Sequence, residues 1–219
     1  MAAGPLPWRV VWITGASTGI GAAVARQLAE GGVTVAASAR SLDTLAALST
    51  ENPLIKAYGL DVTDAKAVAT TFAAIEHDLG LVDLVIAGAG NYAPVSLYNF
   101  SPAPFRQMYE VNYLGVINVL AAVLPAFRAR RRGHISWIAS VAGYVGLPKA
   151  AAYGPTKAAL INLAESLKPE LEQDGVTVSV INPGFVRTPM TANNDFPMPF
   201  LMEPDEAARQ TIAGLRAGH

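Results

Sequence analysis

The sequence predicts an α/β fold in which a doubly wound parallel sheet is covered by helices on both faces. One observation is that short β-branched runs alternate with longer helical stretches, an arrangement typical of parallel sheets. Another is that several of the short runs are apolar throughout, which suits strands buried on both faces. The chain has 219 residues, a length close to that of one domain. We therefore expect a single domain over residues 1–219.

The elements follow from this alternation in chain order. Strands are predicted where β-branched and apolar residues cluster, at Val10–Thr14, Thr34–Ala37, Leu54–Tyr58, Leu81–Ala87, His134–Ala139 and Val176–Ile181. Helices are predicted in the longer stretches, at Ile20–Glu30, Asp43–Leu48, Ala65–Leu79, Pro104–Arg130, Ala151–Gln173 and Pro204–Ala217. The last helix has a start signal in Glu203-Pro204-Asp205-Glu206, and no strand is predicted after it.

The composition excludes several kinds of site. The chain has no cysteine, so disulfides, thiolate zinc sites and a cysteine nucleophile are ruled out. The 16 basic and 17 acidic side chains give a net charge of −1, which argues against a nucleic-acid-binding domain. The three histidines, His77, His134 and His219, lack metal-ligand spacing, and we predict no metal site.

The run Val111–Phe127 is the best candidate for a membrane span, because four arginines follow it closely. It is only 17 residues long and contains Asn112, Asn118 and Pro125, so a buried helix fits it better. The N-terminus lacks the basic and apolar segments of a signal peptide. We therefore expect a cytoplasmic protein with no membrane partner.

A glycine-rich turn links the first strand to the first helix. Gly15, Ser17, Gly19, Ile20 and Gly21 belong to the run GASTGIG, whose glycines have the spacing G-x3-G-x-G. Glycines let the backbone approach a phosphate closely, and the helix N-terminus supplies free N–H groups. A simple turn is the alternative, but the strand before and the helix after it favour a dinucleotide site.

The end of the second strand indicates which dinucleotide is bound. NAD sites usually place a carboxylate there, on the ribose 2′-hydroxyl. This chain has Ala39 and Arg40 instead, with no acidic residue before Asp43. Arg40 can face a 2′-phosphate through a charge-assisted contact, which predicts NADP(H) in preference to NAD(H). The alternative is a solvated arginine at a helix start.

Asp61 and Val62 follow the third strand. The carboxylate of Asp61 could accept a hydrogen bond from an adenine amino group. Alternatively, Asp61 or Asp64 only caps the following helix.

A serine, a tyrosine and a lysine form the candidate catalytic set. Ser140 ends the fifth predicted strand, Tyr153 follows 13 residues later, and Lys157 lies four residues further on. The spacing of four puts Tyr153 and Lys157 on one helical face. A free phenol has a pKa of about 10, and a nearby ammonium lowers it. We expect one lysine, with a cationic nicotinamide alongside, to lower the pKa of Tyr153 to about 7, the best working range for proton transfer, and Ser140 to bond the reacting oxygen.

Together these motifs resemble the short-chain dehydrogenase/reductase family over essentially the whole chain. The resemblance rests on Thr14-Gly15, Gly19-Ile20-Gly21, Asp61-Val62, Asn112, Ser140, Tyr153, Lys157, Pro183-Gly184 and Thr188. It implies a Rossmann-type sheet and an NAD(P)-dependent dehydrogenase or reductase. It also implies that Tyr153 is the general acid/base and that Ser140 holds the substrate oxygen. Lys157 would bind the nicotinamide ribose and lower the pKa of the tyrosine, and Asn112 would support a water relay to the lysine.

The resemblance extends to the rest of the cofactor site. Pro183, Gly184 and Thr188 correspond to the segment that contacts the nicotinamide, and Arg40 again implies NADP(H). Two features depart from the family. Its Asn-Asn-Ala-Gly sequence is here Ala87-Gly88-Ala89-Gly90, in which Ala89 and Gly90 keep room for the cofactor. The family's seventh strand is missing, so six strands are expected.

The predicted function is hydride transfer between NADP(H) and a ketone or secondary alcohol. The alternative is a non-catalytic NADP(H) sensor or regulatory protein, which would keep the glycine turn and lose the catalytic set. An epimerase or dehydratase of the extended family would need a longer C-terminal substrate domain. The substrate is expected to be small and apolar, because the predicted pocket wall is largely aromatic: Tyr92, Tyr98, Tyr144, Phe185, Met190, Phe196, Met198 and Phe200.

A homodimer or homotetramer is predicted from the low content of charged residues, 15%. The two long helices, Pro104–Arg130 and Ala151–Gln173, would join the subunits, as the resemblance also implies. We expect the first of them to expose an apolar face that includes Leu120, Ala121 and Leu124, which a monomer would leave in contact with water.

Overall fold

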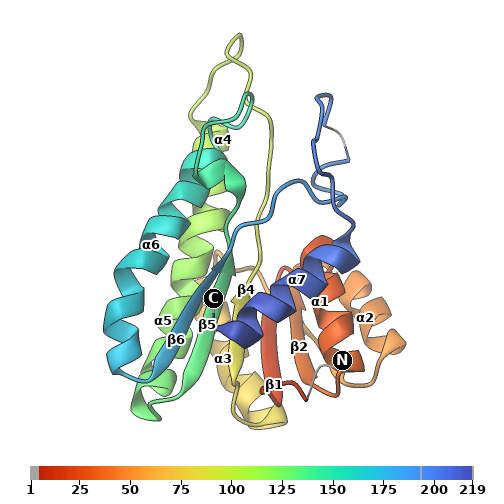
Figure 1. Ribbon diagram of the computed structural model, residues 1–219, viewed down its shortest axis with the longest axis vertical. Helices are drawn as coiled ribbons and strands as arrows, with labels where there is room; N and C mark the ends of the chain where they lie inside the picture. The colour runs from red at the N-terminus through yellow and green to blue at the C-terminus, as the bar shows by residue number, and fades with distance from the viewer. Residues whose placement is uncertain (1–4, 193, 219) are drawn as a thin grey trace.

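The computed structural model describes residues 5–192 and 194–218. Its centre is a six-stranded parallel sheet with the order β3-β2-β1-β4-β5-β6 (Figure 1). The strands are β1 (Val10–Thr14), β2 (Thr34–Ala39), β3 (Ile55–Gly59), β4 (Leu84–Ala87), β5 (Gly133–Ile138) and β6 (Val176–Ile181). The order reverses direction between β1 and β4, and in sheets of this kind ligands bind at that switch point. The predicted doubly wound α/β class is confirmed.

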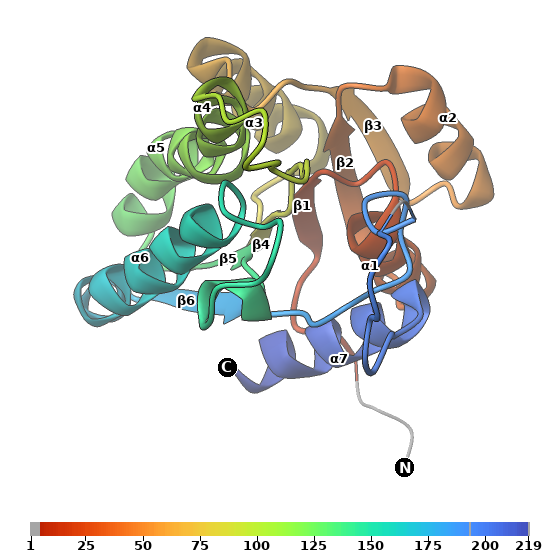
Figure 2. The same cartoon turned by 90° about the horizontal axis from the view of Figure 1, so that it is seen from above.

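Helices cover both faces of the sheet (Figure 2). One face carries α3 (Ala65–Leu79), α4 (Ala103–Tyr109), α5 (Gly115–Ala129) and α6 (Gly154–Gln173), and the other carries α1 (Gly19–Glu30), α2 (Leu42–Glu51) and α7 (Pro204–Ala217). Each face has its own apolar core. In β1, Trp12 is buried in one core and Val11 and Ile13 are buried in the other, so the predicted burial of strands on both faces is observed.

Several predicted bounds shift by one to three residues, and two of the differences have a clear structural cause. The fourth strand begins at Leu84 rather than Leu81, because the backbone N–H of Val82 bonds to the Glu76 carboxylate instead of a neighbouring strand. The predicted helix Pro104–Arg130 is not one regular helix. A π-helix, η1 (Glu110–Leu114), separates α4 from α5, and its wider turn was not visible in the apolar pattern.

The predicted exposed face of α5 is partly wrong. Leu120 is only 4% exposed and belongs to the core, whereas Ala121 is exposed and Leu124 is partly buried. The stretch Ala103–Ala129 is long and apolar enough to cross a membrane by composition. However, Val123 and Phe127 of α5 are fully buried against the sheet, as expected for a core helix.

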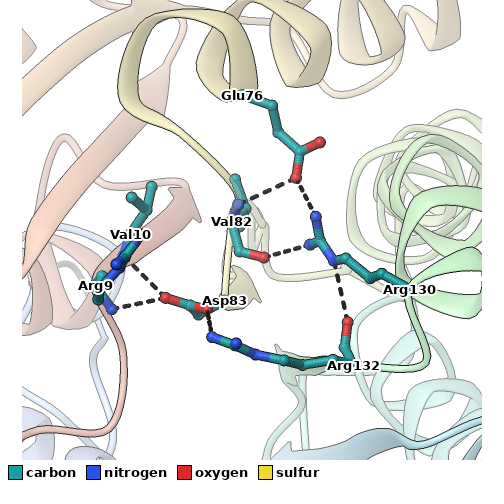
Figure 3. A network of polar contacts seen from close by, with 7 residues as sticks. All are labelled: Arg9, Val10, Glu76, Val82, Asp83, Arg130 and Arg132. Carbon is teal, nitrogen blue, oxygen red and sulfur yellow. Dashed lines mark hydrogen bonds and ion pairs between the residues drawn. The ribbon is translucent and has the colours of Figure 1, made fainter.

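A network of charged groups closes the amino end of the sheet (Figure 3). It joins β1, α3, β4 and the α5–β5 connection through Arg9, Val10, Glu76, Val82, Asp83, Arg130 and Arg132. The Glu76 carboxylate accepts from Arg130 at 2.7 Å and from the backbone N–H of Val82 at 3.1 Å. The Asp83 carboxylate accepts from the backbone N–H of Arg9 at 2.8 Å and pairs with Arg132 at 2.5 Å. These bonds fix the starts of the two central strands.

Candidate active site

The candidate site lies at the opposite, carboxyl end of the strands, in a cavity of about 380 Å³. The structure brings sixteen of the predicted site residues around it, namely Gly15, Ser17, Gly19, Ile20, Gly21, Arg40, Asp61, Val62, Ala89, Gly90, Ser140, Tyr153, Lys157, Pro183, Gly184 and Thr188. Asn112 does not line the cavity and is fully buried beside it. Residues from all parts of the chain thus meet where the strand order reverses.

The glycine turn between β1 and α1 has the geometry of a phosphate cradle. Gly15 has a φ of +72°, and a Cβ there would lie 2.6 Å from the carbonyl oxygen of Gly88. A Cβ on Gly21 would lie 2.5 Å from the carbonyl oxygen of Gly15, so only glycine fits either position. Thr18, the N-cap of α1, makes no side-chain cap. The first N–H groups of the helix are therefore available to an anion, and these residues fit a dinucleotide pyrophosphate.

Arg40 and Asp61 line the same cavity beyond the glycine turn. Asp61 accepts from the backbone N–H and the hydroxyl of Thr63 at 2.9 and 2.8 Å. These two bonds, with a smaller contribution from the positive charge of Arg40, hold the pKa of Asp61 below its ordinary value. The predicted helix-capping role falls to Asp64, whose carboxylate accepts from Ala67 N–H at 2.9 Å.

The segment between β6 and α7 closes the other side of the cavity. Pro183, Gly184 and Thr188 line it, and Thr188 packs so tightly on the glycine turn that a Cβ on Gly19 would lie 2.9 Å from its Cγ2. The base of this segment is held by a β-bridge between Val186 and Met202. The chain thus returns to the nucleotide turn before it enters α7.

The tyrosine and the lysine come from the start of α6. Tyr153 is the N-cap of this helix and Lys157 lies one turn further on. Lys157 is 5% exposed, its Nζ donates to the carbonyl oxygen of Ile138 at 2.7 Å, and it lies 5.4 Å from the centre of the Tyr153 ring. Burial lowers the pKa of Lys157 to about 8. The site therefore holds a cation that proton exchange can neutralise near physiological pH.

The protein's own side chains do not lower the pKa of Tyr153. Burial raises the pKa of this phenol to about 12, and the nearby phenol of Tyr92 adds to the increase, while a hydrogen bond with Ser140 opposes it. Desolvation outweighs the chain's own favourable contacts because it disfavours the phenolate. The side chains alone therefore keep Tyr153 protonated at neutral pH, with Ser140 hydrogen-bonded to its hydroxyl.

Asn112 lies in the π-helix η1, where it is fully buried and hydrogen-bonded to neighbouring residues. Its Oδ1 accepts from the backbone N–H of Asn91 at 2.8 Å, and its Nδ2 donates to the carbonyl oxygen of Asn91 at 3.0 Å and to the hydroxyl of Thr156 at 3.2 Å. Both amide hydrogens and the carbonyl oxygen are thus in use. The side chain of Asn112 therefore holds the backbone of Asn91 in place. The preceding residue, Gly90, lines the cavity.

The predicted aromatic wall is only partly assembled. Tyr92 packs edge-on against Tyr153, with ring centres 5.4 Å apart at 81°, and Phe185 contacts Phe196. Met190 lines the cavity. Tyr98 and Phe200 are 99% and 97% exposed, so the expectation that they form the pocket wall is wrong.

Sequence reasoning also missed several residues of the cavity. They share small or apolar side chains next to recognised motifs, and they include Thr18, Ala39, Ser41, Leu60, Gly88, Val111, Ile138, Ala139, Val186 and Thr191. Six of them, Ala39, Ser41, Leu60, Gly88, Ile138 and Ala139, lie at or just after the end of a strand, which is the signal that could have found them. Val111 is different because it depends on the π-helix, which no local pattern indicated.

Comparison with known proteins agrees with this geometry. The short chain dehydrogenase family matches residues 9–197. An uncharacterized oxidoreductase of Myxococcus xanthus is 38% identical over 97% of this chain and 86% of its own length. A similar protein of Staphylococcus epidermidis is 34% identical over 86% of this chain and 82% of its own.

Solved structures show the same arrangement. ElxO with NADP bound has a TM-score of 0.85 and 25% identity, with 93% of this chain and 90% of that chain covered. A short-chain dehydrogenase from Streptomyces avermitilis has a TM-score of 0.85 and 28% identity, with 94% and 83% covered. With the family match spanning most of the chain and the relatives named oxidoreductases, this protein is a member of the short-chain dehydrogenase family and an oxidoreductase.

Proposed function

We propose that this protein is an NADP(H)-dependent oxidoreductase that interconverts a ketone and a secondary alcohol, with Tyr153 as the general acid/base. The observation that carries the proposal is the placement of Ser140, Tyr153 and Lys157 on the same cavity as the glycine turn. The nicotinamide, when bound, supplies or accepts the hydride. All other steps fall to the chain's own side chains.

Tyr153 and Ser140 would act on the substrate oxygen. Because burial keeps the phenol protonated, Tyr153 is ready to donate its proton to the oxygen as the carbonyl becomes an alcohol. Ser140, at the end of β5, donates a hydrogen bond to the same oxygen and holds it in line with the phenol. In the reverse direction Tyr153 takes the proton back. Lys157 places a positive charge beside the ring and stabilises the phenolate that forms.

The replacement Tyr153→Phe tests the proposed role. It removes the proton and leaves the ring that packs against Tyr92, so we expect turnover to fall by at least 10³-fold, within the range that acid–base catalysis contributes. NADPH binding, measured by fluorescence titration, should change less than threefold. The matched control is Tyr58→Phe, which removes an exposed hydroxyl bonded to Asp78 and should leave turnover unchanged. More than a tenth of wild-type turnover in Tyr153→Phe would contradict the assignment.

Preference for NADPH is proposed to depend on Arg40. This residue lines the cavity next to Ser41 at the start of α2 and lies close enough to Asp61 to affect its pKa. A charge-assisted contact with a 2′-phosphate contributes about 1.5–3 kcal/mol, so Arg40→Ala should weaken NADPH binding by about 10- to 100-fold. NADH has no 2′-phosphate and should bind almost as before. Equal losses for both dinucleotides would contradict the proposed preference.

The proposed substrate is a small, mainly apolar carbonyl compound or alcohol. Support comes from Met190, which lines the cavity, and from the ring of Tyr92 beside Tyr153. A screen of ketones of increasing size with NADPH, monitored at the absorbance of the nicotinamide, measures this preference. If no carbonyl compound is turned over while NADPH binds, the alternative of an NADP(H) sensor is favoured.

The proposed assembly is a homodimer or homotetramer joined through α5 and α6, and the proposed location is the cytoplasm. These helices lie side by side on one face of the sheet (Figure 2). Partly buried apolar residues, among them Leu124 on α5 and Leu163 on α6, remain at their surface. Light scattering at micromolar concentration decides between the alternatives, because a mass of 22.9 kDa, that of one chain, would contradict the assembly.

A further inference from the structure

We infer that Thr156 is a positioning residue for the proposed reaction, and that it holds the Tyr153–Lys157 turn in place through Asn112. Thr156 is 1% exposed and lies on the first turn of α6, three residues after Tyr153. It does not line the cavity, so it contacts neither substrate nor cofactor there. The inference rests on the proposed role of Tyr153.

The donor and the acceptor in each side-chain hydrogen bond of Thr156 follow from the groups involved. Its hydroxyl donates to the carbonyl oxygen of Tyr153 at 2.7 Å, because a carbonyl can only accept. The same hydroxyl oxygen must then accept from Asn112 Nδ2, 3.2 Å away. The threonine therefore uses its single proton on the tyrosine backbone and its lone pair on the asparagine.

The orientation of Asn112 is fixed as well. Its Oδ1 faces the backbone N–H of Asn91 and its Nδ2 faces the carbonyl oxygen of the same residue. A reversed amide would place two donors together and two acceptors together. The hydrogen that points to Thr156 is therefore held in a single direction.

These bonds connect three elements beneath the catalytic groups. They run from Asn91, after β4, through Asn112 in η1 and Thr156 in α6 to the carbonyl of Tyr153. That carbonyl also accepts from the backbone N–H groups of Thr156 and Lys157 at 3.0 and 3.3 Å. The backbone bonds exist in any helix start, whereas the bond that the Thr156 hydroxyl accepts from Asn112 ties the start of α6 to η1.

A purely structural role makes a different prediction. A buried threonine that only caps its own helix would affect stability and leave the acid–base step unchanged. A positioning residue instead affects the orientation of the phenol, and a displacement of about 1 Å at a reacting group can reduce the rate by about 10²-fold. Turnover and its pH dependence therefore separate the two roles.

The experiment compares Thr156→Val, Thr156→Ser and Thr211→Val in the full chain with NADPH and a substrate ketone. Valine keeps the shape of threonine and removes the hydroxyl, serine restores the hydroxyl, and Thr211 is a similarly buried threonine in α7. We expect Thr156→Val to lower kcat by 10- to 100-fold with KM and NADPH affinity changed less than threefold. In the plot of kcat against pH, the apparent pKa assigned to Tyr153 should move by at least half a unit. Thr156→Ser should recover most of the turnover, and Thr211→Val should match the wild type.

A kcat of Thr156→Val within threefold of wild type would overturn the inference. So would an unchanged pH limb with a loss of stability alone. If the valine variant does not fold, Thr156→Ala, which introduces no new bulk, is judged by the same limits. Tyr153→Phe, measured alongside, separates the two claims: if it stays active the proposed function fails, and if it is inactive while Thr156→Val is normal only the positioning role fails.

Discussion

The charged side chains at the two ends of the sheet differ in whether they form ion pairs. At the amino end, guanidinium and carboxylate groups are paired, as in Glu76 with Arg130 and Asp83 with Arg132. At the carboxyl end, Lys157 is buried and, within residues 5–192 and 194–218, forms no ion pair. Its ammonium group donates to the carbonyl oxygen of Ile138 and lies beside the ring of Tyr153.

The contrast indicates where stability and function reside in this fold. The amino end satisfies its polar groups internally, so it stabilises the starts of the strands and has little left to offer a ligand. The carboxyl end keeps a buried cation, free N–H groups on α1 and a protonated phenol. Such groups lower stability and are available for binding and proton transfer.

Replacing Lys157 should have the largest effect, and it should change turnover without lowering stability. Lys157→Met removes the charge beside Tyr153, and we expect turnover to fall by about 10³-fold. Stability should be unchanged or higher, because burial makes the charged form unfavourable. Turnover assays and thermal unfolding at pH 7 measure both effects.

The pH dependence of the free energy of unfolding tests whether Lys157 is desolvated in the folded state. Its pKa is lowered from 10.5 to about 8 by burial, so the folded state loses the proton first as pH rises. The wild type should therefore gain stability relative to Lys157→Met between about pH 8 and 10.5. A parallel pH dependence of the two proteins would show that the lysine is not desolvated in this way.

His134, at the start of β5, should make the amino end sensitive to acid. Burial lowers its pKa from 6.5 to about 4, and its Nε2 lies 2.9 Å from the hydroxyl of Ser179. The unfolded chain takes up the proton first as pH falls, so about 3 kcal/mol of unfolding free energy should be lost between pH 6.5 and 4. His134→Gln should lack this loss, which denaturant titrations at several pH values would measure. An equal loss in both proteins would contradict the assignment.

The ion pair at the amino end should have a smaller effect, on stability alone. Arg130 and Glu76 are each 19% exposed, and Arg130 also donates to the carbonyl oxygens of Val82 and Arg132. Arg130→Met leaves Glu76 partly buried without its partner and should cost about 2 kcal/mol. Turnover per folded molecule should not change, in contrast to Lys157→Met.

The matched control for this pair is Arg128→Met. Arg128 pairs with Asp174 but is 61% exposed, and exposed pairs contribute less than about 1 kcal/mol. Chemical unfolding of the two variants compares them directly. Equal destabilisation by both substitutions would mean that burial is not what makes the amino-end network matter.

Much of the fold could be predicted from residue patterns. β1, β6, α3 and α7 have the predicted bounds, because each combines a clear apolar pattern with a clear start or end signal. β4 was predicted too long because Val82 is buried like a strand residue while its N–H bonds to Glu76. A long-range side-chain contact of this kind leaves no local pattern.

The residues that form the site could be predicted better than the pKa of its tyrosine. Tyr153 and Lys157 could be placed together by spacing alone, but the upward shift of the tyrosine pKa depends on how deeply the phenol is buried. The role of Thr156 was likewise hidden, because its partner Asn112 lies 44 residues away in the sequence. Residue spacing identifies neighbours along one helix. Hydrogen bonds between groups that are distant in the sequence become visible only in the tertiary structure.

The π-helix η1 has a consequence for how this chain can tolerate changes in length. A π turn holds one residue more than the α-helical turn it replaces, so η1 sets the rotation of α4 relative to α5. Deleting one residue within Glu110–Leu114 would restore a regular helix and turn the side chains inside the shortened segment by about 100°, the angle between successive residues of an α-helix. Asn112 would then turn away from Asn91 while Val119 and Val123 kept their places in the core. A shortened helix could thus still fold while losing the part of the chain that supports its active site.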